Sequence, residues 1–202
     1  MKYLKMLGLA VVAAAAVMAF VGASSASATT LTCTSGASTI TCPAGTVIDA
    51  SAESSLLLKA GFANITCTTS TVKGKTTNAG SSTETVKGNI EELTFGNCNA
   101  TVTVIKKGTL EIHTHTEGVT NHIGTLTGSG SEVTVSTLGT SCVYGTSNTD
   151  LGTLTGSPLT GGTATMDISA QLPKISGGFL CASPAAWEGS YKVTEPDWLD
   201  VD

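Results

Sequence analysis

The chain has 202 residues, a charged fraction of 12% and a formal net charge of −5, and its ten basic residues are all lysine. This acidic balance argues against a nucleic-acid partner, because nucleic-acid binders concentrate Arg and Lys to neutralise phosphates. The chain also has no arginine, whose guanidinium group can bind a phosphate or carboxylate substrate through two parallel hydrogen bonds. With 35 Thr, 21 Ser and 23 Gly, the composition instead favours strands and turns.

Residues 1–28 have the three-part plan of a secretory signal peptide. A basic start precedes an apolar run over 6–21, and small residues end the segment at Ala26-Ser27-Ala28. This ending predicts cleavage before Thr29. An uncleaved membrane anchor is the alternative, since the apolar run approaches the length of a spanning helix. No second apolar segment follows, so we expect a secreted, extracellular protein with no membrane span after cleavage.

Six cysteines follow the predicted leader: Cys33, Cys42, Cys67, Cys98, Cys142 and Cys181. An even number of cysteines in an exported protein indicates disulfide bonds. We predict the sequential pairing, in which Cys33 and Cys42 flank a turn-forming stretch and the other two bonds close loops of about 30–40 residues. A metal cluster or a nucleophilic thiol is the alternative, but no C-x-x-C pair occurs and no cysteine neighbours a histidine.

Apolar and polar residues alternate with a period of two along most of the remaining chain, and no stretch sustains helical periodicity for three turns. The alternation predicts strands over 39–42, 46–50, 64–73, 82–95, 101–104, 109–117, 123–127, 132–136, 140–145, 151–155, 163–171, 177–182 and 187–194. One short helix is expected near 52–60, where three leucines precede Gly61.

Short strands with one buried and one wet face, separated by Gly, Asn and Ser clusters, are typical of antiparallel sheets. We therefore predict an all-β antiparallel sandwich, with a β-barrel as the alternative, stapled by up to three disulfides. No proline-rich linker occurs, which favours a single domain over 29–202. A small hairpin lobe over 29–60 is a variant of this organisation.

The segment 111–117 contains two of the three histidines. On a strand, Glu111, His113, His115 and Glu117 share one face. Two imidazoles at this spacing can hold a zinc or copper ion, with Glu117 or His122 completing a site that has an open position for water. The alternative is that these polar groups form the solvated face of an amphipathic strand.

Trp187 and Trp198 are the candidate ligand-binding aromatics, because aromatic faces stack on sugars. Trp187 alternates with Tyr191 and Val193 on one face of a predicted strand, which is typical of a buried face. Trp198 lies in an acidic segment near the end of the sequence and is expected to be more exposed.

No catalytic residue is predicted, because the sequence shows no nucleophile elbow and no convincing acid and base pair. The leading hypothesis is a secreted, non-enzymatic structural or binding protein of the cell exterior, without a cofactor, whose partner is a cell-envelope component or a glycan. The second is a metal-binding protein or metal-dependent hydrolase that uses His113 and His115. The third is a carbohydrate-binding module.

Overall fold

The computed structural model describes residues 29–35, 38–114 and 121–202, and these residues form strands, turns and loops. No helix occurs among them, so the predicted all-β class is confirmed. In this described part, accordingly, no helix has the length and hydropathy needed to cross a membrane.

The expected short helix near 52–60 is wrong. Its residues belong to two strands, β3 (Val47–Ala52) and β4 (Leu56–Gly61). Both run antiparallel to β5 (Asn64–Thr76) and to β16 (Cys181–Glu195). Together, β3 and β4 fill the position between β5 and β16 in the sheet. Because neighbours on both edges supply backbone hydrogen-bond partners, sheet pairing outweighs the helix propensity of a short leucine-rich run.

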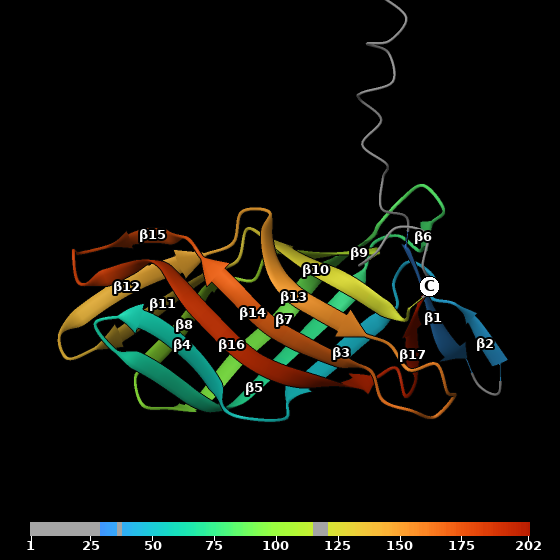
Figure 1. Cartoon of the computed structure of the whole chain (residues 1–202), viewed down its shortest axis with the longest axis horizontal. Coiled ribbons are helices and arrows are strands. Elements are labelled where there is room, and N and C mark those ends of the chain that lie inside the picture. Colours follow the sequence, from blue (N-terminus) through green and yellow to red (C-terminus); the bar gives the residue numbers. More distant parts are fainter. Residues whose placement is uncertain (1–28, 36–37, 115–120) are drawn as a thin grey trace, which may run out of the picture.

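Eight strand positions close into an antiparallel barrel (Figure 1). The hydrogen-bonded order is β14 (Thr165–Leu172), β13 (Thr149–Thr155), β10 (Ile123–Ser129), β9 (Thr109–Thr114), β7 (Val86–Cys98), β5, β3 and β16. Pairing between β14 and β16 completes the ring. Most neighbours in the ring also follow one another along the chain, as in up-and-down barrels. Of the two predicted architectures, the barrel is supported and the sandwich is not confirmed.

A second antiparallel sheet prolongs one side of the barrel wall. Its order is β15 (Lys174–Gly177), β12 (Thr140–Gly145), β11 (Glu132–Thr137) and β8 (Thr101–Lys106). Each of these strands directly precedes or follows a barrel strand in the sequence. The paired strands β8 and β11 therefore lie beyond the paired barrel strands β9 and β10, separated from them by a few unpaired residues. The sheet therefore extends the barrel at the left end in Figure 1.

The opposite end of the barrel carries a small sheet, which we call the cap (Figure 1). It consists of β17 (Leu199–Val201), β1 (Thr29–Ser35) and β2 (Ser38–Thr41), with β6 (Gly80–Ser81) also paired to β1. Leu31 and Leu199 are fully buried, and Val201 lies beside Gly124 of β10. The cap therefore covers this end of the barrel with apolar side chains.

All three disulfides have the predicted sequential pairing. Cys33–Cys42 lies in the cap, Cys67–Cys98 joins directly opposed residues of β5 and β7, and Cys142–Cys181 joins β12 to the start of β16. No cysteine is free. Three disulfides are compatible with an extracellular protein.

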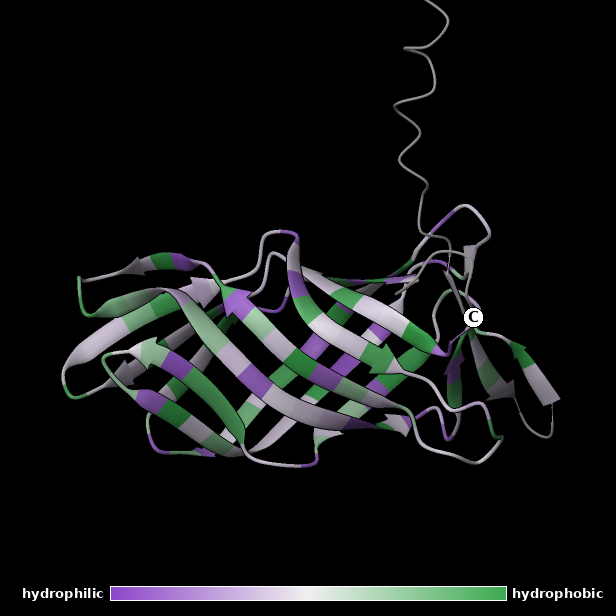
Figure 2. Cartoon of the chain, viewed as in Figure 1, coloured by the Kyte–Doolittle hydropathy of each residue, from purple (hydrophilic) through white to green (hydrophobic). Residues whose placement is uncertain are grey.

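Apolar and polar residues alternate along the barrel strands (Figure 2). In β14, for example, Met166, Ile168, Ala170 and Leu172 are buried, while the residues between them are exposed. In β16, Tyr191 and Val193 are buried and Lys192 and Thr194 are exposed, as the alternation predicted. The barrel interior is consequently apolar, and many Thr and Ser side chains lie on its outer face.

Candidate functional site

The interior of the barrel contains two adjoining cavities, of about 100 Å³ and about 50 Å³. Val72, Leu110, Leu126 and Met166 line both of them. The larger cavity extends toward the second sheet, where Phe95 and Trp187 contribute to its wall. Their rings meet edge to face with centroids 6.3 Å apart. No charged side chain among the described residues lines this larger cavity.

Small residues of the barrel strands leave space around the smaller cavity. An eight-stranded barrel is wide enough to be filled by side chains or to hold one small ligand. Here Gly74, Gly88 and Ala50 border the smaller cavity. Only 4% of the chain is aromatic, so few large side chains are present to fill the remaining space.

Two buried tyrosines, Tyr144 and Tyr191, are among the residues that line the larger cavity. The Tyr191 hydroxyl lies 3.0 Å from Ser70 Oγ, and the Tyr144 hydroxyl donates to Ala60 O at 3.1 Å. Burial raises the pKa of Tyr191 to about 12, and burial also raises the pKa of Tyr144. Both phenols therefore stay neutral at physiological pH.

One side of the barrel wall is incompletely paired. β7 pairs with β9 only over Val86–Asn89, whereas β8 pairs with β11 and with no other described strand. Leu93, Phe95 and Val102 line the larger cavity beside these unpaired edges and are partly exposed. The larger cavity therefore lies beside a stretch of wall in which β7 and β8 lack a second pairing partner among the described strands.

The predicted metal-binding strand is only partly described. Glu111 and His113 lie in β9, where Ile112 is buried between them and faces the smaller cavity. Glu111 accepts a hydrogen bond from Thr85 and forms an ion pair with Lys87. His113 therefore lies on the outer face, as expected. It belongs to no cluster of three potential metal ligands among the described residues.

His115 and Glu117 lie outside the described residues, so their predicted part in a metal site with His113 stays a prediction. The structure does not bring His122 into a cluster with His113. It places His122 just before β10, in a left-handed backbone conformation with φ of 58°.

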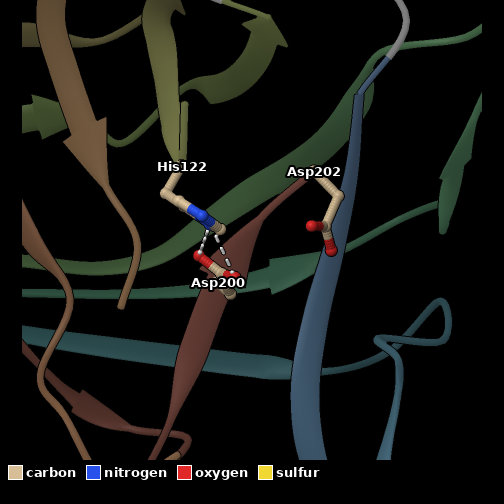
Figure 3. Close-up of side chains that lie close together, drawn as sticks. All are labelled: His122, Asp200 and Asp202. Carbon is tan, nitrogen blue, oxygen red and sulfur yellow. Dashed lines mark hydrogen bonds and ion pairs between the residues drawn. The ribbon is translucent and has the colours of Figure 1, made fainter. Parts of the chain in front are cut away.

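His122 instead hydrogen-bonds to Asp200 of the cap, and Asp202 lies nearby (Figure 3). Its Nδ1 lies 2.9 Å from both carboxylate oxygens of Asp200, whose side chain is only 8% exposed. Asp202 completes a group in which one ligand atom from each residue lies within 4.8 Å of the others. We call these residues the His122 cluster. Asp200 and Asp202 are not among the predicted metal ligands, although they have the spacing of one strand face.

The two tryptophans occupy different environments. Trp187 lines the larger cavity, as its place in an alternating strand suggested. The expected exposure of Trp198 is wrong, because this residue is only 6% exposed and its Nε1 donates to Ser157 O at 2.9 Å. Trp198 therefore offers no open face for stacking on a sugar.

Comparisons of the chain with protein-family models, with curated proteins and with solved structures find no match.

Proposed function

We propose that this protein is exported and acts outside the cytoplasm as a non-enzymatic binding protein that holds a small apolar molecule in its barrel. The observation that carries the proposal is the cavity of about 100 Å³ with an almost wholly apolar lining. The signal-peptide pattern of residues 1–28 and the three disulfides support export.

An apolar guest suits this cavity better than water does. A buried water molecule needs two to four polar partners, and the phenolic hydroxyls of Tyr191 and Tyr144 are already engaged with Ser70 and Ala60. An empty cavity of about 100 Å³ would cost on the order of 2 kcal/mol of stability. A bound apolar molecule restores the missing contacts.

The size of the cavity limits the size of the ligand. A water molecule occupies about 30 Å³ of liquid, and an engineered apolar cavity of about 150 Å³ binds benzene. The larger cavity lies between these values, and the smaller one adjoins it across Val72 and Leu110. The ligand class is therefore a small ring or a short hydrocarbon segment without charge.

Binding of benzene and n-hexane to the purified protein, measured by ligand-observed NMR and by thermal shift, tests the proposal. Val72→Phe would add a ring at the boundary of both cavities and should abolish binding. Val143→Phe makes the same change at a position that lines neither cavity and should leave binding intact. Absence of binding to the wild-type protein, or equal binding by the Val72→Phe protein, would favour a purely structural role at the cell exterior.

A further inference from the structure

We propose that His122, Asp200 and Asp202 form a binding site for a divalent transition-metal cation, with zinc or manganese as the best fit. The site is independent of the apolar cavities, because none of the three residues lines either one. It shares only His122 with the site predicted on the His113 strand.

The charges of the His122 cluster call for a cation. Asp200 is more than nine-tenths buried, and a buried carboxylate is costly unless it is paired. Among the ion pairs of the described residues, none brings a lysine to Asp200 or Asp202. Among the described side chains, only the imidazole of His122 forms an ion pair with either of these carboxylates, so the cluster has an excess of negative charge that a divalent ion would neutralise.

The surrounding structure positions each ligand. Asp200 and Asp202 are separated by one residue, which is the spacing of one strand face. Thr32 lies opposite Asp200 in the pairing of β1 with β17, and its hydroxyl donates a hydrogen bond to Asp202 Oδ2 at 2.5 Å. Gly156 N donates to His122 O at 2.7 Å. The bond from Thr32 orients the Asp202 carboxylate, and hydrogen bonds to ligating carboxylates are a usual part of metal sites.

Gly156 also makes room for the buried carboxylate. A Cβ at this position would lie 2.5 Å from Asp200 Oδ1 and 2.6 Å from Val201 N. The absence of a side chain at 156 therefore lets Asp200 reach His122 from the cap.

The donor set defines the class of ion. One imidazole nitrogen and two carboxylate oxygens suit zinc and manganese, whereas calcium prefers six to eight oxygen ligands. Because the His122 side chain is 34% exposed and Asp202 is exposed, water can fill the remaining coordination positions. The ion would join the start of β10 to the last strand of the cap and so fasten the cap to the barrel.

Isothermal titration of chelator-treated protein without a histidine tag, using zinc chloride and manganese chloride, tests the proposal. We expect saturable binding of one equivalent, a rise in the melting temperature on adding metal, and affinity at least about tenfold lower in the His122→Ala and Asp202→Asn proteins. Since Asp202 is exposed, Asp202→Asn should fold even if substitution of the buried Asp200 does not.

Two matched controls locate the site. Asp197→Asn removes an equal charge from a nearby exposed aspartate and should bind metal like the wild type. His113→Ala should also retain binding. Loss of binding in His113→Ala with retention in His122→Ala would overturn the proposal in favour of the His113 strand. Weak, non-stoichiometric binding that is unchanged in His122→Ala and Asp202→Asn would also overturn it, by indicating an adventitious ion only.

Discussion

The hydroxyl of Tyr191 lies 3.0 Å from Ser70 Oγ in the buried interior, where β16 faces β5. The Ser70 hydroxyl donates a hydrogen bond to Thr94 O at 2.6 Å. Its only proton is therefore engaged, and Tyr191 is the donor in the hydrogen bond between the two hydroxyls. The interaction therefore uses the protonated phenol, and ionisation of Tyr191 would place an unpaired charge among apolar side chains.

The stability of the protein should decline at alkaline pH. Folding raises the pKa of Tyr191 from about 10 to about 12, so the folded state keeps a proton that the unfolded state loses. The free energy of unfolding should be unaffected by this group below about pH 10 and should fall by on the order of 2–3 kcal/mol as the pH rises to about 12. Urea denaturation across this range measures the decline.

Tyr191→Phe is the control for that decline, because it retains the ring and removes the ionisable group. Its stability should depend less on pH between about 10 and 12 than that of the wild type. In the folded wild-type protein, tyrosinate absorbance from Tyr144 and Tyr191 should also develop at higher pH than in urea. Tyrosinate formation near pH 10 in the folded protein would contradict both expectations.

The alternation of apolar and polar residues predicted many of the strands, because it can be recognised within the sequence of one strand. The strand over 140–145 has the predicted bounds, and Tyr191 and Val193 face the interior as expected. The run Leu56-Leu57-Leu58 has no such alternation, so its pairing with both β5 and β16 decides its conformation. Closure of the ring by β14 and β16 is likewise a relationship between strands that no local pattern contains.

Fluorescence should distinguish the two tryptophans. Trp187 lines the larger cavity, whereas Trp198 is bound to Ser157 beside the cap. An apolar ligand that enters the cavity should therefore change the emission of Trp187 and leave that of Trp198 unchanged. We expect benzene to alter the spectrum of a Trp198→Phe protein and to have no effect on a Trp187→Phe protein. The reverse pattern would place the ligand near the cap.

Removal of the disulfides should follow the order of their loop lengths. Cys67 and Cys98 are separated by 31 positions, and Cys33 and Cys42 by 9. Chain entropy then predicts a loss of about 3–4 kcal/mol when the first pair is replaced by alanine, and about 1 kcal/mol less for the second pair. Denaturant unfolding of the two double variants tests this order. A larger loss for the Cys33–Cys42 pair would show that native contacts in the cap outweigh chain entropy.

The candidate sites could be predicted less well than the strands. The spacing of Asp200 and Asp202 indicates one strand face, but their approach to His122 depends on how the cap docks on the barrel. The apolar cavities are lined by residues of many strands that meet only when the ring closes, so no single segment encodes them. Trp198 was expected to be exposed because its acidic neighbours are polar, and its burial follows from contact with distant Ser157.

Gly156 should tolerate substitution poorly, because it lies where the cap meets the barrel. In a Gly156→Ala protein the new methyl group would lie 2.5 Å from Asp200 Oδ1 and 2.6 Å from Val201 N, so β17 would have to shift. We expect a loss of about 1–3 kcal/mol. Gly178→Ala provides the matched control, because a Cβ there meets nothing within 4 Å and should change stability by less than about 0.5 kcal/mol. Urea midpoints that are equal in the two variants would show that the cap moves aside without cost, and would remove the steric argument that Gly156 positions Asp200.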